Sequence, residues 1–219
     1  SYLFAVARFV LLFLLFPTAL SLAQAHRPAQ FIDNGKEFIG RIHVPKRMPA
    51  ERVVVLASGR VDASGRIRGM SVLRSKEDTV SKFQESVKSA STFLRLSPAI
   101  VDSEAREVWF SFSVVFEAVA DTVEVSVYPY LSVNEEKPNA EFSSPQRVLD
   151  EYFPSACRAE GVIWTSTLIS DKGLPSNPEI SGGGARCQQY LEEHLLNSEY
   201  LPAMLEGVFV EASYLEIWY

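Results

Sequence analysis

A short motif that occurs twice constrains the fold of this chain more than any other feature. The letters LSPAIV begin at Leu96, and YLPAML begins at Tyr200. Each copy follows a run with helical periodicity and precedes a β-rich run, and a turn glycine stands 33 residues before the proline of the first copy and 29 before that of the second. The order strand, turn, strand, helix, Pro-Ala, strand thus occurs twice. Chance readily repeats one short motif, but it does not readily repeat a whole order of elements together with the turn glycine and the Pro-Ala dipeptide. We therefore predict a duplicated module.

Periodicity in the first copy predicts two strands, a helix and two further strands. Asp and Gly in a short loop between β-rich runs are typical of a hairpin turn. Apolar residues spaced three, four and three apart form one face of a helix, here Val80, Phe83, Val87 and Ala90. Strict alternation from Val108 to Phe116 predicts a strand with one buried face. The predicted strands are 53–61, 66–73, 108–116 and 122–127, with the turn at 62–65 and a helix capped by Asp78 or Thr79.

The second copy repeats this order with shorter elements. We predict a strand over 161–169, a turn at 170–173 and a proline-bearing edge strand over 174–180. A glycine loop then leads into a helix with Cys187, Tyr190, Leu191, His194 and Leu195 on one side. The last predicted strand covers 208–218. Outside the copies, we expect one short strand over 38–44 and a short helix that begins at Arg147 and breaks before Pro154.

These elements predict an α+β fold with two small modules, each an antiparallel sheet with one helix packed on it in the order β-β-α-β. The polar, proline-bearing stretch between the copies is the expected linker. The predicted organisation is a signal peptide (1–25), a lead-in segment (26–50), a first module (51–131), a linker (132–151) and a second module (152–219).

The first 25 residues have the layout of a secretory signal peptide. Arg8 is their only charge, and an apolar run leads to Pro17, small residues and Ala23-Gln24-Ala25, an A-x-A cleavage pattern. The alternative is an uncleaved membrane anchor, since about 20 apolar residues span a bilayer. Either interpretation exports the rest of the chain, and we expect a periplasmic protein that contacts the membrane only if the segment is uncleaved.

The charge of the exported part argues against two kinds of partner. The chain has 21 Lys and Arg against 27 Asp and Glu, and without Arg8 the net charge is −7 (20 minus 27). Nucleic-acid backbones are contacted through Lys and Arg, so an acidic surface disfavours nucleic acid. The same charge disfavours docking on anionic lipid.

The sequence contains two cysteines, Cys157 and Cys187. An even cysteine count in an exported protein predicts a disulfide, and two buried thiols are the alternative. There is no C-x-x-C, which argues against a redox enzyme.

No motif with catalytic or ligand-binding spacing stands out. His26, His43 and His194 lack metal-ligand spacing, so packed or solvated histidines and no metal are expected. The run SGGGAR opens a helix and resembles a phosphate-binding loop only in its glycines; a loop joining strand to helix explains it as well. No nucleophile elbow is present. We expect no cofactor and no enzymatic activity.

The residues of the second copy resemble the carboxy-terminal domain of TonB-family energy transducers, which are small periplasmic α+β modules. That family opens on an aromatic-Pro entry with Ala, Arg and Gly, continues through an Asp-x-Gly turn and Asn, and ends on aromatic-x-Pro-Ala, Gly and Val. The matching residues are Tyr152, Pro154, Ala156, Arg158, Gly161, Asp171, Gly173, Asn177, Tyr200, Pro202, Ala203, Gly207 and Val210. The first copy matches in VDASGRIRGMSVL and in LSPAIV with the run that follows, so the resemblance covers about 51–117 and 152–219.

In that family the last strand of the module accepts a short receptor peptide as an added strand. The resemblance therefore implies a partner-binding edge over 208–218, whereas the strand over 122–127 is expected to cover the corresponding edge of the first copy. The implied partner-binding residues are Val208, Val210, Ala212, Tyr214 and Trp218. Most aromatic side chains on the strands are expected in the core, and Trp218 and Tyr219 are the expected exceptions.

Two features of transducers are missing from this sequence, a long proline-rich spacer and a histidine in the apolar segment. We therefore expect an exported, non-catalytic binding or scaffold protein of the bacterial cell envelope with a peptide or protein partner. The alternative is a membrane-anchored TonB-like transducer or transport-coupling protein. A hydrolase of envelope polymers is a second alternative, which no catalytic constellation in the sequence supports.

Overall fold

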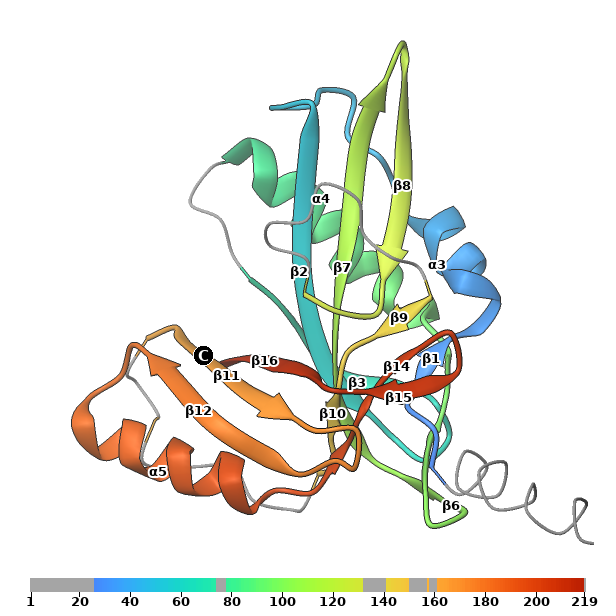
Figure 1. Cartoon of the computed structure of the whole chain (residues 1–219). Coiled ribbons are helices and arrows are strands. Elements are labelled where there is room, and N and C mark those ends of the chain that lie inside the picture. Colours follow the sequence, from blue (N-terminus) through green and yellow to red (C-terminus); the bar gives the residue numbers. More distant parts are fainter. Residues whose placement is uncertain (1–25, 74–77, 132–140, 150–156, 158–160, 219) are drawn as a thin grey trace, which may run out of the picture.

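The computed structural model describes residues 26–73, 78–131, 141–149, 157 and 161–218 (Figure 1). The fold is α+β, with several small antiparallel sheets. The α-helices of the described residues are α3 (Lys36–Arg41), α4 (Asp78–Ala90) and α5 (Ala185–Asn197), and 3₁₀ turns lie at η1 (Ile32–Gly35) and η2 (Ser91–Phe93).

The strands before residue 131 are β1 (Gln30–Phe31), β2 (Arg52–Val61), β3 (Ile67–Val72), β4 (Leu96–Ser97), β5 (Ala99–Val101), β6 (Glu104–Arg106), β7 (Val108–Val119) and β8 (Thr122–Tyr128). The later strands are β9 (Phe142–Ser143), β10 (Gln146–Arg147), β11 (Ile163–Ile169), β12 (Pro175–Ser181), β13 (Tyr200–Leu201), β14 (Ala203–Leu205), β15 (Val208–Val210) and β16 (Ala212–Trp218). Periodicity thus predicted the long strands and both long helices to within a few residues.

Two sheets dominate the fold. The larger has the order β3-β2-β7-β8, and the smaller has the order β12-β11-β16. In both, a hairpin is followed by a helix and by a strand that pairs antiparallel with the first strand of the hairpin. Strand β8 pairs along β7, so the prediction that this strand covers the β7 edge is confirmed. Strand β12 is an edge strand, as its prolines predicted.

Both hairpins turn at a glycine that no other residue can replace without strain. The N–H of Gly65 donates to the carbonyl of Asp62 at 2.8 Å, and the N–H of Gly173 donates to that of Ser170 at 3.0 Å. Gly65 has a φ of 76° and Gly173 a φ of 79°, a region that side chains disfavour. A Cβ on Gly173 would also overlap the carbonyl oxygen of Tyr200, and one on Gly65 would overlap that of Leu96.

Helix α4 covers one face of the larger sheet, and α5 covers one face of the smaller sheet (Figure 1). Phe83 of α4 contacts the ring of Phe116 on β7, with ring centroids 4.8 Å apart. On α5 the buried residues are Cys187, Leu191 and Leu195. These are the helix faces that the spacing predicted.

The two sheets meet through the faces that point away from these helices. Leu56 of β2 belongs to one apolar cluster with Ile217 of β16, and Trp164 and Leu215 pack against it. Strand β7 is buried from Val108 to Phe116 with only Trp109 half-buried. The prediction of one buried face for this strand was therefore wrong, because the second face is covered by chain from elsewhere in the fold.

Residues 36–41 form helix α3, so the strand predicted over 38–44 was wrong. Phe38 and Ile42 are both buried, and a spacing of four fits a helical face as well as an alternating strand. Phe38 packs against Phe112 of β7 at a centroid distance of 6.0 Å. The tertiary contact decides between the two patterns.

The stretch predicted as a lead-in and the stretch predicted as a linker each contribute a short strand. Strand β1 pairs with β4, and β10 pairs with β13, so each strand that precedes a Pro-Ala motif has an antiparallel partner. Arg147 lies in β10 rather than at the start of a helix; residues 150–156 of that predicted helix lie outside the described residues.

None of the helices in the described ranges has the length and apolar composition needed to span a bilayer. Residues 1–25, for which the signal peptide was predicted, lie outside those ranges.

Candidate functional site

The predicted binding edge over 208–218 consists of two strands rather than one. Strand β15 pairs with β14, and β16, which begins after Glu211, pairs with β11. Val208 and Val210 therefore lie in a small sheet of order β15-β14-β9, whereas Ala212, Tyr214 and Trp218 lie at the edge of the sheet that packs on α5.

The side chains of these five residues have different surroundings. Val208 is 64% exposed, and Val210 and Ala212 are half-buried. Tyr214 and Trp218 are buried in the core beneath α5. The expectation that Trp218 escapes burial was wrong, because the strand runs under the helix; Tyr219 lies outside the described residues.

Strand β15 belongs to a tight hairpin with a two-residue turn. Glu206 and Gly207 have φ values of 51° and 80°, the positive pair that a type I′ turn requires. The equivalent hairpin of the first copy, β5–β6, turns at Asp102 and Ser103 with φ values of 50° and 67°. In a two-residue hairpin turn, the residues on either side of the turn, here Leu205 and Val208, form a hydrogen-bonded pair. The next pair along the strands, Met204 and Phe209, is not hydrogen-bonded, so the backbone N–H and C=O of Phe209 point away from β14.

The two hairpins differ in the chemistry of their outer strand. Strand β6 has the sequence Glu-Ala-Arg and is exposed throughout. Strand β15, after the same turn, has the sequence Val-Phe-Val. Within the described part of the chain, β15 pairs with β14 on one side and with no strand on the other. Natural sheet edges are commonly protected by charge, so an uncharged, apolar edge is the more unusual of the two.

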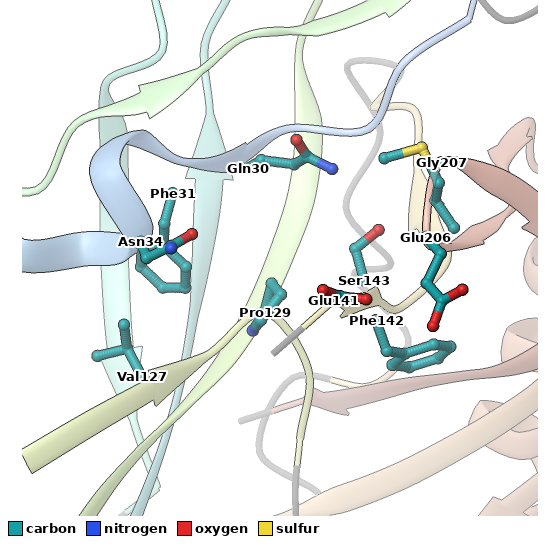
Figure 2. A pocket seen from close by; sticks show the side chains of 11 residues that line it. Gln30, Phe31, Asn34, Val127, Pro129, Glu141, Phe142, Ser143, Glu206 and Gly207 are labelled. Atoms are coloured by element: carbon teal, nitrogen blue, oxygen red, sulfur yellow. The ribbon is translucent and has the colours of Figure 1, made fainter. Parts of the chain in front are cut away.

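A cavity of about 760 Å³ lies next to this hairpin (Figure 2). One wall is formed by β1 and η1, and the facing wall by β9 and the turn between β14 and β15. The end of β8 and Pro129 lie between the walls. The lining residues are Gln30, Phe31, Asn34, Val127, Pro129, Glu141, Phe142, Ser143, Met204, Glu206 and Gly207. We call this cavity the groove.

The lining of the groove combines apolar rings with amides, a hydroxyl and carboxylates. Ser143 is 2% exposed, and its Oγ has no hydrogen-bond partner among the described residues. Glu141 and Glu206 are the charged residues of the lining, and the backbone N–H of Glu206 donates to the carbonyl of Glu141 at 3.4 Å. The described lining therefore has acidic and no basic side chains. Sequence reasoning missed the groove, because its residues come from four distant segments.

A second polar cluster lies in the core beneath α5. The guanidinium of Arg147 donates to both carboxylate oxygens of Glu216, through Nε at 3.1 Å and Nη2 at 2.9 Å. The phenol of Tyr214 donates to Oε2 of the same carboxylate at 2.5 Å. Arg147 is 3% exposed and Glu216 2%. We call these three residues the buried polar triad.

The shifted pKa values of Tyr214 and Arg147 preserve the protonation states that the hydrogen bonds of the buried polar triad need. Burial and the neighbouring Glu216 carboxylate raise the pKa of Tyr214 above its ordinary value, so the phenol stays protonated and donates. Burial opposes the charge of Arg147, but the interactions with Glu216 and Tyr214 together more than offset it and raise the pKa of the guanidinium. Nη1 of Arg147 lies 3.2 Å from Nε2 of His194 on α5. The guanidinium, the carboxylate, the phenol and the imidazole thus lie within hydrogen-bond distance of one another, which is typical of a cluster that stabilises the fold.

The triad replaces an aromatic cluster of the larger sheet. Arg147 pairs with Tyr200 as Phe31 pairs with Leu96, and both partners stand two residues before the proline of a Pro-Ala motif. Tyr214 and Glu216 occupy the register positions on β16 that Phe110 and Phe112 occupy on β7. The rings of Phe31 and Phe110 lie 5.5 Å apart, and those of Phe31 and Phe112 5.7 Å. Nothing in the spacing of Arg147 and Glu216 along the sequence predicted their contact.

Cys157 and Cys187 form the predicted disulfide, which joins the start of α5 to the chain before β11. Among the described residues, no group of three or more His, Cys, Asp and Glu side chains has the geometry of a metal site. The SGGGAR run joins β12 to α5 as a connecting loop, with positive φ at Gly182 and Gly183.

Comparison with known proteins identifies no relative: no family model, no curated protein and no solved structure matches the chain.

Proposed function

We propose that the chain is an exported, non-catalytic binding protein of the bacterial cell envelope that recognises a peptide or protein segment through a sheet edge. We further propose that it consists of two copies of one β-β-α-β module. The shared strand order of the two sheets, the paired turn glycines and the paired type I′ hairpins support the duplication. The Cys157–Cys187 disulfide supports an oxidising compartment such as the periplasm.

One observation carries the binding proposal: β15 is an apolar, uncharged edge strand, whereas β6 at the same place in the other hairpin is charged. An extended segment added beside β15 would bond the outward backbone groups of Phe209, and its side chains would contact Val208 and Val210. Strand β12 is a poorer acceptor, since Pro175 and Pro178 lack the N–H that pairing needs. Tyr214 and Trp218 lie on β16, in the other sheet, and are buried beneath α5, so they do not contact a partner at this edge.

The test compares two substitutions at one position. Phe209→Pro removes the outward N–H together with the ring, whereas Phe209→Ala removes the ring alone. Residues 26–219 and both variants are used to capture proteins from an envelope extract under non-reducing conditions, followed by quantitative mass spectrometry. We expect specific partners that the Pro variant loses to a greater extent than the Ala variant.

Equal capture by all three proteins would contradict binding through this edge. The identity of the partners also separates the alternatives: enrichment of outer-membrane receptors or motor subunits would favour the transport-coupling role. Enrichment of another envelope complex would favour the scaffold role.

A further inference from the structure

The buried side chain of Gln146 forms hydrogen bonds with the extended backbone at Ala29. The Gln146 side chain accepts a hydrogen bond from the N–H of Ala29 through Oε1 and donates through Nε2 to the carbonyl of the same residue, both at 2.8 Å. Gln146 and Ala29 are both buried. One amide thus satisfies both backbone groups of one residue, as a neighbouring strand would.

Gln30 has the same position in the first copy. Each glutamine is paired with the residue directly before a Pro-Ala dipeptide, Gln30 through β1–β4 and Gln146 through β10–β13. Ala29 directly precedes Gln30 in the sequence. The corresponding residue, directly before Gln146, is Pro145, which has no backbone N–H. The pair of bonds from Gln146 to Ala29 therefore has no counterpart from Gln30 to Pro145. The Gln30 side chain instead lines the groove (Figure 2).

Ser143 is a second indication of a ligand in the groove. Its hydroxyl is enclosed and has no hydrogen-bond partner in the described part of the chain, and Ser143 lines the same cavity on the opposite wall from Gln30. Buried hydroxyls are normally hydrogen-bonded, and an unsatisfied one is unfavourable. A rotation of the Ser143 side chain would bring this hydroxyl to the groove, where a backbone N–H or C=O of a ligand would supply the missing partner.

The charge of the lining selects among such ligands. Glu206 is exposed at the rim, in the turn next to β15, and Glu141 lies on the same wall; no described lining residue is basic. Phe31, Phe142 and Met204 add apolar surface between these polar groups. A cationic side chain on an extended peptide fits this combination, whereas an acidic side chain is repelled.

We propose that the groove binds an extended peptide segment that carries a lysine or arginine, with the Gln30 amide bonded to the peptide backbone and the Glu206 carboxylate paired with the cation. This inference rests on the proposed function and names the class of peptide. It also adds a contact surface distinct from the outer edge of β15.

The experiment selects ligands from random linear heptapeptides displayed on phage, with residues 26–219 as the immobilised target. Peptides that survive selection are synthesised with a fluorescent label, and their affinity is measured by fluorescence anisotropy. The variants are Gln30→Ala and Glu206→Lys. The matched control is Glu179→Lys, which makes the same charge change at an exposed position of β12. Circular dichroism confirms that each variant is folded.

We expect the selected peptides to share a basic residue at a fixed position. Affinity should fall roughly tenfold for Gln30→Ala, which removes two hydrogen bonds, and roughly tenfold for Glu206→Lys, which replaces attraction by repulsion. The control should bind like the wild-type chain.

Selected peptides without a basic residue, or peptides bound equally by both groove variants, would overturn the groove assignment. If such peptides lose affinity for Phe209→Pro but not for Phe209→Ala, the binding edge stands and the groove inference alone fails. If no peptide is enriched, the result contradicts the groove inference, while the capture experiment with the Phe209 variants decides separately on the proposed function.

Discussion

The buried polar triad allows a sharp test of how the core beneath α5 is stabilised. Arg147→Met leaves the Glu216 carboxylate in the core without its cation, and Glu216→Gln leaves the guanidinium without its anion. Because both partners are almost fully enclosed, water cannot replace the lost interaction. Removing one partner of such a pair costs about 3–5 kcal/mol of unfolding free energy. At about 2–4 °C per kcal/mol for a chain of this size, the melting temperature should fall by roughly 6–20 °C.

The larger sheet suggests the variant that should reverse this loss. Its residues at the same register positions are Phe31, Phe110 and Phe112, so the triple substitution Arg147→Phe, Tyr214→Phe and Glu216→Phe copies a cluster that this fold already packs. Replacing a buried ion pair by well-packed apolar residues is often neutral or stabilising. We expect the triple variant to recover most of the stability that either single variant loses.

The assay is urea unfolding followed by tryptophan fluorescence and by circular dichroism. Trp218 is a local reporter, since the Arg147 guanidinium lies 5.4 Å from its ring. The control is Arg106→Met, which breaks a pair with Glu199 that is about half exposed and 3.8 Å long; such pairs contribute about 0–1 kcal/mol. Single triad variants that lose no more than this control would refute the reasoning, as would a triple variant no more stable than the single ones.

Three further predictions concern the turns, the disulfide and pH. Gly173→Ala should destabilise the protein in thermal melts, because the added Cβ meets the carbonyl oxygen of Tyr200 and the residue has a positive φ. Gly40→Ala in α3 should stabilise by about 0.5–1 kcal/mol, because its Cβ meets no atom of the described residues within 4 Å; equal effects of the two substitutions would contradict this. Replacing Cys157 and Cys187 by serine should cost about 3–4 kcal/mol in urea unfolding, from the 30-residue separation they close, and an unchanged midpoint would contradict it. Hydrogen bonds from Ser64, Arg66 and Arg68 hold the pKa of Asp62 well below its ordinary value. The unfolding free energy of the wild-type chain should therefore exceed that of Asp62→Asn by its full amount at neutral pH. This difference should decline below about pH 4, the pKa of the carboxyl in the unfolded chain, as the pH falls towards the lower pKa of the folded chain. A difference that stays independent of pH down to the acid transition would contradict this prediction.

The parts of the fold that sequence reasoning predicted depend on local physical chemistry. The spacing of apolar residues shows which side of a strand or helix is apolar. It correctly predicted the buried side of α4, with Phe83 and Val87, and one of the two buried faces of Val108–Phe116. The turn at Asp62–Gly65 follows from residues that favour it wherever they occur. The disulfide followed because two cysteines allow one pairing.

The parts that were missed depend on which distant segments meet. Two-residue strands such as β1 and β10 have no periodicity to read, and they form because each lies beside the strand that precedes a Pro-Ala motif. Helix α3 satisfies two patterns at once, and its contact with β7 selects one. The final strand divides at Glu211 because β15 folds back on β14 whereas β16 continues along β11.

The sequence by itself determined the order of the long strands and of helices α4 and α5, the two hairpin turns and the disulfide, because propensity, periodicity and turn chemistry act over a few residues. Only the tertiary structure decided the candidate sites. Arg147 meets Glu216 across 69 residues of chain, and the groove brings Gln30 opposite Ser143. Such contacts are selected by the packing of whole sheets and by the need to satisfy buried polar groups, and neither leaves a spacing that can be read along the chain.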